Sequence, residues 1–473
     1  MKILVSALLL SSLPTSAANP ALESFLSDPA LKTASVGFSL IPLKETQTND
    51  PTNQSDSDKD SNKDSAQPLH HHPDLALTPA SVQKAITTAT ALQILGPDYQ
   101  FETRLYQSGD DIIIKGGGDP LLASSSINVE FPAWHQALLD ADLESITGTL
   151  IADPSRFEDR TTPNQWLWGD LGNYYGAGPN GLNFHRNSYQ ITFDPGSVGS
   201  IARVVSTYPK PPGVTFENHM LTGSSRSGDQ GFAYVGPRRT LITFRGTVPA
   251  GSNFTIKGAL PNPPLSCVSA FQDYLAKKDF EVAKIKVKRK AASPDHKLLH
   301  TTKSPSLAKI IISTNQKSIN LNAECLFKAL TPQGSTLSAQ KKLISHWKEQ
   351  GVDLNGFLAH DGSGLSPQNT LTARQAAHIL KLMANSEHAA AYRTSLPVAG
   401  RSGTLRSFAK NTAAEGRLLA KTGSMERVRS WAGYLTTRSG KKYSFALLIN
   451  HYHGSDSSIR AAASRFLGKL CEQ

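Results

Sequence analysis

The separation of two short polar motifs along the chain constrains the fold more than any other feature of the sequence. Ser-Val-Gln-Lys at Ser81–Lys84 and Ser-Ile-Asn at Ser318–Asn320 carry complementary chemistry, yet 234 positions separate Lys84 from Ser318. A loop within one active site needs far fewer residues, so we expect at least one additional domain between the two motifs. A third motif, Lys-Thr-Gly, follows at Lys421–Gly423. The sequence therefore predicts one catalytic domain built from both ends of a 473-residue chain.

The first motif combines a nucleophile with a base. A serine hydroxyl needs a base before it can attack a carbonyl, and Lys84 lies one helical turn after Ser81, on the same face. Lys84 can act only when neutral, and burial together with the positive charge of Lys421 would lower its pKa. The same Ser-x-x-Lys pattern begins at Ser306, Ser338, Ser345, Ser407 and Ser439. Ser81 differs because it follows Pro79-Ala80 and opens a largely apolar run over 85–95 that predicts a buried helix.

The second and third motifs supply the remaining groups of an acyl-transfer site. Ser318 can pass a proton, and the amide of Asn320 can orient both substrate and base. Lys421 can hold a carboxylate, and backbone N–H groups of Ser81 and Ser424 can stabilise an oxyanion. The candidate catalytic residues are thus Ser81, Lys84, Ser318, Asn320 and Lys421, and Thr422, Gly423 and Ser424 are candidates for substrate binding.

The N-terminal segment predicts export. A mostly apolar run over 3–13 follows Met1-Lys2, and small residues over 15–18 provide a cleavage site. This pattern is typical of a signal peptide, here residues 1–17, and the run is too short to span a bilayer comfortably. We expect a periplasmic or otherwise exported protein, soluble or loosely associated with the cell envelope.

Charge and cysteine content argue against a nucleic-acid-binding protein and against a zinc or thioredoxin-like cysteine site. Lys and Arg number 49 and Asp and Glu 38, which gives a net charge of +11, and the excess is spread along the chain. The densest basic segment, 284–290, alternates as a strand with one solvated face would, so we expect no nucleic-acid partner. Cys267, Cys325 and Cys471 have no Cys-x-x-Cys spacing. One disulfide is possible but nothing selects a pair, and we expect no metal and no cofactor.

Composition along the chain divides it into four segments. The tract 45–67 is polar and contains no aromatic residue, so we expect a mobile loop within the first catalytic segment, 18–100. The segment 101–298 is rich in short β-like runs separated by Gly and Pro, which predicts inserted β-rich domains. Within it, Pro261–Pro264 is interpreted as a turn. The segment 299–473 returns to an α/β pattern and forms the second catalytic segment.

Five stretches carry a resemblance to a known family: Pro79–Lys84, Gly116–Pro120, Ser318–Asn320, Asp361–Ser366 and Ala420–Ser424. On these stretches the chain resembles a low-molecular-mass class C penicillin-binding protein, a serine D-alanyl-D-alanine carboxypeptidase/endopeptidase, over nearly all of its mature length. Ile319 replaces the Asp of the usual Ser-Asp-Asn motif. The resemblance implies an α/β catalytic domain like that of penicillin-binding proteins and serine β-lactamases, with a long β-rich insert forming two extra domains. It also implies peptidoglycan stem peptides as substrates, an acyl-enzyme on Ser81 and inhibition by β-lactams.

The resemblance extends to a side-chain pocket, with departures. In the family, an Asp after a Trp-containing stretch helps to hold the free end of a diaminopimelate side chain. Asp170 matches that Asp, and Tyr175 matches an aromatic partner. Pro367 stands where the family has an arginine, and Glu426 where it has a glutamine. These two replacements predict altered recognition of the side chain.

Two alternatives stay open at this point. The first is a serine β-lactamase, although the Glu-x-x-Leu-Asn pattern that would activate its deacylating water does not occur. The second is a non-catalytic wall-binding homologue, which the intact motifs disfavour. For Asp361 and Ser363, the sequence equally supports a role in shaping the floor of the site and a purely structural tight turn.

Overall fold

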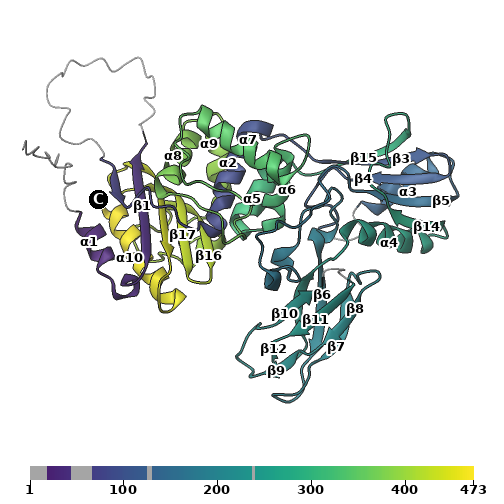
Figure 1. Cartoon of the computed structure of the whole chain (residues 1–473), viewed down its shortest axis with the longest axis horizontal. Helices are drawn as coiled ribbons and strands as arrows, with labels where there is room; N and C mark the ends of the chain where they lie inside the picture. Colours follow the sequence, from purple (N-terminus) through teal and green to yellow (C-terminus); the bar gives the residue numbers. More distant parts are fainter. Residues whose placement is uncertain (1–18, 44–66, 125–129, 237–239) are drawn as a thin grey trace, which may run out of the picture.

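The computed structural model describes residues 19–43, 67–124, 130–236 and 240–473 (Figure 1). The signal peptide lies outside these residues, as does nearly all of the tract 45–67. Of the helices in the part of the chain that is described, none is long and apolar enough to cross a membrane.

A five-stranded antiparallel sheet joins the two ends of the chain. Its order is β16 (Leu418–Met425), β17 (Val428–Thr436), β18 (Lys442–Asn450), β1 (Ser35–Pro42) and β2 (Leu69–His71). The pairing of β1 with β18 runs from Ser35 opposite Asn450 to Pro42 opposite Tyr443. The N-terminal strand is therefore held in the middle of a sheet made mostly from the last sixty residues or so.

Helices cover both faces of this sheet. On one face, α1 (Pro20–Leu26) packs against α10 (Asp456–Glu472), and Phe25 stacks on Phe466 with ring centroids 4.5 Å apart. On the other face, α8 (Ala373–Ala384) contacts β18 and β1. Thr372 caps the start of α8, because its side chain accepts from the backbone N–H of Gln375. Figure 1 shows the first and last helices side by side at one end of the molecule.

A second layer of helices carries the first two motifs. The helix α2 (Gln83–Leu95) contacts α5 (Leu307–Lys317), α6 (Asn320–Ala329), α7 (Thr336–Glu349) and α9 (Ala389–Ser395). Residues 83–92 of α2 are all buried, which is why this helix has no polar face and reads as a continuous apolar and Thr-rich run.

The first and last residues of the insert lie next to each other. The backbone groups of Phe101 and Ser304 are neighbours: Ser304 N donates to Phe101 O at 2.9 Å, and Phe101 N donates to Ser304 Oγ at 2.9 Å. Between them, a mixed sheet has the order β14 (Glu281–Val287), β5 (Ser145–Asp153), β4 (Asp111–Lys115), β3 (Glu102–Ser108) and β15 (Lys297–Lys303). Since β15 pairs with β3, this sheet extends beyond residue 298.

A second group of strands lies between β5 and β14 in the sequence. Three small sheets are formed by β13 (Phe254–Ala259), β6 (Ser188–Asp194) and β7 (Arg203–Tyr208), by β10 (Phe232–Val235), β11 (Leu241–Arg245) and β8 (Thr215–Asn218), and by β12 (Thr247–Pro249) with β9 (Leu221–Gly223). Figure 1 shows the two groups projecting from the catalytic domain in different directions. The expected extra domains are thus present.

Two helices pack on the mixed sheet, α3 (Phe131–Leu139) and α4 (Pro263–Ala276). The interpretation of 261–264 as a turn is wrong for its second half. Asn262 caps α4, its side chain accepting from Leu265 N at 3.2 Å, and Pro263 begins the helix. Proline suits the first helical position because its fixed φ fits and its missing N–H costs no hydrogen bond there.

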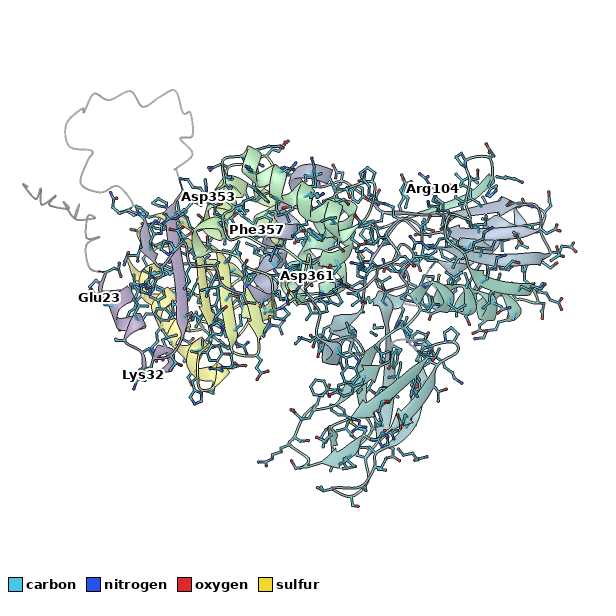
Figure 2. All side chains as sticks on the ribbon, viewed as in Figure 1. Glu23, Lys32, Arg104, Asp353, Phe357 and Asp361 are labelled. Atoms are coloured by element: carbon cyan, nitrogen blue, oxygen red, sulfur yellow. The ribbon has the colours of Figure 1, made fainter. Side chains whose placement is uncertain are left out.

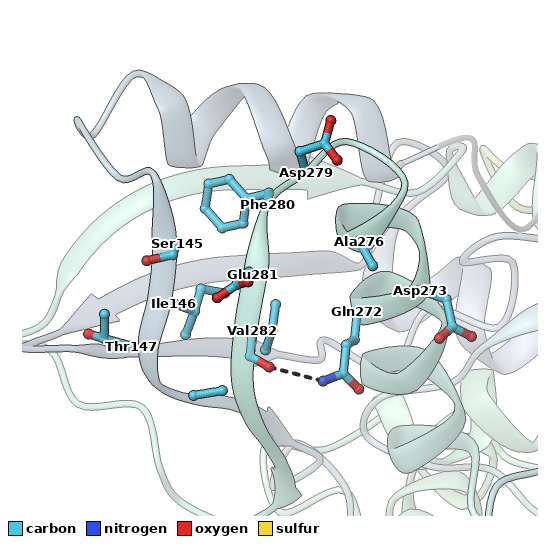
Figure 3. A pocket seen from close by; sticks show the side chains of 11 residues that line it. Ser145, Ile146, Thr147, Gln272, Asp273, Ala276, Asp279, Phe280, Glu281 and Val282 are labelled. Carbon is cyan, nitrogen blue, oxygen red and sulfur yellow. Dashed lines mark hydrogen bonds between the residues drawn. The ribbon is translucent and has the colours of Figure 1, made fainter.

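The outer edge of the mixed sheet carries a hollow of about 820 Å³ between α4, β5 and β14 (Figure 3). Gln272 crosses it, its side-chain amide donating to the carbonyl of Val282 at 3.2 Å. None of the motif residues lines this hollow. The three cysteines lie on α4, α6 and α10, and all are buried and unpaired.

Candidate active site

Ser81 lies at the point where the chain enters α2. It is the middle residue of a short 3₁₀ turn, Ala80–Val82, and the preceding Ala80 has a left-handed backbone with φ of 45°. Such a backbone costs free energy in a non-glycine residue and is common at functional sites. The side chain of Ser81 is partly exposed, whereas Lys84, one turn later, is completely buried. The Ser81 side chain is therefore accessible to solvent, while the neighbouring Lys84 amine is shielded from water.

The amine of Lys84 has three hydrogen-bond partners. Its Nζ donates to Ser81 Oγ at 2.9 Å, to Asn320 Oδ1 at 2.6 Å and to the carbonyl of Ser363 at 2.7 Å. The predicted pairing of the first two motifs is thus present in the structure.

Burial lowers the pKa of Lys84 to about 7, against the opposing influence of the Asp361 and Glu324 carboxylates. A neutral amine beside a serine hydroxyl is what the proposed base requires near neutral pH. The positive charges of Lys84 and Lys421 repel each other, as the sequence predicts. Burial first and this repulsion second lower the pKa of Lys421.

The second motif occupies a sharp bend between two helices. Ser318 ends α5 with a left-handed backbone, φ 55° and ψ 42°, and Asn320 begins α6 two residues later. Ser318 Oγ accepts a hydrogen bond from Lys421 Nζ at 2.9 Å. Asn320 uses both ends of its amide, since Oδ1 accepts from Lys84 and Nδ2 donates to the carbonyl of Tyr175 at 2.8 Å. The bend thus connects the first motif, the third motif and the insert.

The third motif lies on the edge strand β16. Lys421 is completely buried and donates to Ser318 Oγ and, at 2.6 Å, to the carbonyl of Thr422. A β-carbon at Gly423 would lie 2.4 Å from the carbonyl oxygen of Pro79 and 2.2 Å from Ser430 Oγ, so only glycine lets the strand approach the segment before Ser81. The next residue, Ser424, is exposed and contacts Arg429. The three motifs therefore converge on one site.

The loop Asp361–Ser366, which was not among the predicted catalytic residues, contacts Lys84 through the carbonyl of Ser363. Asp361 is completely buried, and its carboxylate accepts four hydrogen bonds, from Trp166 Nε1 and Asn369 Nδ2 and from the backbone N–H groups of Gly364 and Ser366. This turn fixes the carbonyl of Ser363 that receives Lys84. Because Trp166 belongs to the insert, Asp361 also ties the two parts of the molecule together, and Figure 2 shows it where they meet. The contacts of Asp361 are therefore compatible both with a role in shaping the floor of the site and with a purely structural tight turn.

Glu324 is a member of the site that the sequence did not reveal. It lies on α6, one turn after Asn320, and is completely buried. Its Oε1 accepts from the backbone N–H of Ser363 at 2.7 Å. Burial, followed by the nearby Asp361 carboxylate, raises the pKa of Glu324 to about 7. The spacing of four residues from Asn320 was a signal that could have identified it.

Of the four positions that were predicted for the side-chain pocket, Asp170 and Tyr175 contact each other. The hydroxyl of Tyr175 donates to Asp170, and burial raises the pKa of both groups. Tyr175 joins the motifs through its carbonyl, which Asn320 contacts. Pro367 and Glu426 are exposed, and among the described residues no hydrogen bond or ion pair joins either of them to Asp170 or Tyr175.

No group of three or more His, Cys, Asp or Glu residues suited to hold a metal ion occurs in the described part of the chain.

The fold and the three converging motifs define a serine acyl-transfer enzyme. The chain belongs to the D-Ala-D-Ala carboxypeptidase 3 (S13) family, whose model matches residues 18–470. It is thus a serine-type D-Ala-D-Ala carboxypeptidase by family, as the resemblance predicted. This membership favours the carboxypeptidase interpretation over the β-lactamase and the non-catalytic alternatives.

Individual relatives agree with the family. The D-alanyl-D-alanine carboxypeptidase of Actinomadura sp. is 26% identical over 421 residues, which cover 80% of this chain and 74% of that protein. The carboxypeptidase DacB of Haemophilus influenzae is 25% identical over 406 residues, which cover 80% and 81%. The crystal structure of penicillin-binding protein 4 from Haemophilus influenzae aligns with a TM-score of 0.80 at 22% identity, over 96% of this chain and 98% of that one. This alignment confirms a penicillin-binding fold with additional domains.

Proposed function

We propose that Ser81 is the nucleophile of a D-Ala-D-Ala carboxypeptidase that also acts as an endopeptidase on peptidoglycan stem peptides. One observation carries the assignment: the Lys84 amine, with its pKa lowered to about 7, lies 2.9 Å from the Ser81 hydroxyl. Serine in such a pair is activated for attack on an amide carbonyl.

In the acylation step, Lys84 Nζ takes the proton of Ser81 as Oγ attacks the carbonyl between the two D-alanines. The backbone N–H groups of Ser81 and Ser424 stabilise the resulting oxyanion. The C–N bond then breaks, and the leaving amine receives a proton through the Ser318 hydroxyl. The acyl group stays on Ser81 as an ester, which water hydrolyses to regenerate the serine.

The terminal carboxylate of the substrate binds at Lys421 and Thr422. Lys421 is a buried amine without an acidic partner among the residues described, and burial lowers its pKa. A substrate carboxylate supplies the missing counter-charge, which favours the protonated amine and strengthens binding. Gly423 permits the close approach of β16 that this binding requires.

β-Lactams present a carboxylate and a reactive amide in one molecule and would acylate the same serine. A β-lactam complex of penicillin-binding protein 4 from Haemophilus influenzae aligns with this chain at a TM-score of 0.75. Endopeptidase action is the same reaction with a larger leaving amine. Export to the envelope follows from the predicted signal peptide, since the polymer lies outside the cytoplasm.

The test is release of D-alanine from an acetylated Lys-D-Ala-D-Ala peptide. We expect the wild type to release D-alanine and Ser81→Ala to lose at least about 10³-fold in kcat/KM. Ser306→Ala is the matched control, because Ser306 begins another Ser-x-x-Lys pattern and its side chain makes no capping hydrogen bond. A folded Ser81→Ala enzyme with unchanged release would overturn the proposal.

A further inference from the structure

A hollow of about 420 Å³ adjoins the second motif, where the insert meets the catalytic domain. Its lining includes Tyr175, Arg186 and Lys257 from the insert and Lys317, Ser318 and Asn320 from the catalytic domain. Asn320 forms part of its wall and also contacts Lys84 at 2.6 Å. A group bound in the hollow would therefore lie next to the reacting pair.

Three cationic side chains from three separate elements line this hollow. Arg186 belongs to the short turn His185–Asn187, Lys257 to β13, and Lys317 is the last residue of α5. No Asp or Glu residue is among the lining residues. Within the described ranges, none of the three cations makes a side-chain hydrogen bond or an ion pair. The wall thus concentrates positive charge without a protein counter-ion.

The position of Arg186 is set by its surroundings. Its backbone is left-handed, with φ of 57°, and the neighbouring Asn187 is completely buried. Asn187 is fixed from both sides, since its Oδ1 accepts from Phe184 N at 2.9 Å and its Nδ2 donates to Asn183 Oδ1 at 2.7 Å. The guanidinium is half-buried, and burial alone lowers its pKa. A partly desolvated cation without a partner favours an anionic ligand.

The chemistry of the three side chains selects a carboxylate. A guanidinium offers paired N–H donors that match the two oxygens of a carboxylate, and the lysines add charge at adjustable positions. The terminal carboxylate of the substrate is already assigned to Lys421. In carboxypeptidase action, the leaving group is a single D-alanine, which carries only that terminal carboxylate. A second carboxylate must therefore come from the acyl side of the scissile bond.

We propose that Arg186, Lys257 and Lys317 form a subsite for a second carboxylate of the peptide substrate, located on the acyl side of the cleaved D-Ala-D-Ala bond. This subsite rests on the proposed function and adds a specificity determinant to it. The acylation chemistry needs no contribution from it, so a small neutral acyl group should react without using the hollow.

Two pairs of D-Ala-D-Ala peptides test the subsite. In the first pair, the residue before D-Ala-D-Ala ends in a carboxyl group or in the matching carboxamide. In the second pair, the same exchange is made one residue further toward the N terminus. Values of kcat/KM are measured for the wild type, Arg186→Gln and Lys257→Gln. The matched control is Arg203→Gln, which removes the same charge from the neighbouring strand β7 at an exposed position outside the hollow.

We expect the wild type to prefer the carboxyl peptide in at least one pair by about tenfold or more. Arg186→Gln should remove most of that preference and leave the carboxamide peptide within about twofold, and the preference should weaken with added salt. Lys257→Gln should give a smaller loss in the same direction, and it tests the subsite even if Arg186→Gln folds poorly. Equal use of both members of both pairs by the wild type would overturn the proposal, as would a preference that survives both substitutions. Penicillin labelling of Ser81 and turnover of the carboxamide peptides report the proposed function separately.

Discussion

The pH dependence of acylation follows directly from the environment of Lys84. The base acts only when neutral, and burial lowers its pKa to about 7. Below that value, each pH unit reduces the neutral fraction about tenfold, so acylation should rise as pH increases. The neutral fraction is about one half at pH 7 and about 1% at pH 5, which predicts acylation about fifty-fold slower at pH 5 than at pH 7.

The assay is the second-order rate of labelling by a fluorescent penicillin between pH 5 and pH 8. Glu324→Gln is the informative comparison, because Glu324 also titrates near 7 and its carboxylate raises the pKa of Lys84. Removing that carboxylate should move the midpoint to lower pH and make labelling near pH 7 faster, whereas at pH 5, where Glu324 is almost fully protonated, the two proteins should differ little. A wild-type rate that changes less than about threefold between pH 5 and pH 7 would refute the assignment of Lys84 as the base. A flat profile in Glu324→Gln alone would transfer the titration to Glu324.

Three further outcomes are expected. Asp361→Ala leaves four buried donors without an acceptor, so we expect urea denaturation to show a free energy of unfolding lower by at least about 4 kcal/mol. The control Asp353→Ala, on an exposed turn, should lower it by less than about 1 kcal/mol, and similar losses in the two variants would contradict this role of Asp361. Asp170→Ala should lower kcat/KM for peptides with an amine-bearing side chain, because the Asp170 carboxylate can pair with the ammonium group; unchanged values in a folded Asp170→Ala enzyme would be inconsistent with this. Lys421→Met should raise KM for D-Ala-D-Ala peptides more than it lowers kcat, and the reverse split would argue against a carboxylate contact.

The sequence predicted a helix where the pattern of apolar residues lies within a single short segment. The run over 85–95 corresponds to α2, and burial of residues 83–92 accounts for its apolar and Thr-rich composition. Helix α4 was missed because prolines that look like a turn are also the residues that can begin a helix.

The motifs predicted the site, and local spacing could have identified Glu324, but the partners of the supporting residues could not be found from local patterns. The carboxylates of Asp361 and Glu324 act through Ser363, whose carbonyl receives Lys84, and 279 positions separate Ser363 from Lys84. Contacts over such distances depend on how the two halves of the chain fold around the insert. The same holds for Arg186, whose sequence context gives no sign that it lines a hollow beside Asn320.

Formation of the covalent intermediate on Ser81 can be read out by mass spectrometry of the penicillin-treated protein. After proteolysis, we expect a single adduct on the peptide that contains Ser81, absent from Ser81→Ala and retained in Ser306→Ala. An adduct mapped to Ser306 or Ser407, or undiminished labelling of a folded Ser81→Ala protein, would contradict it.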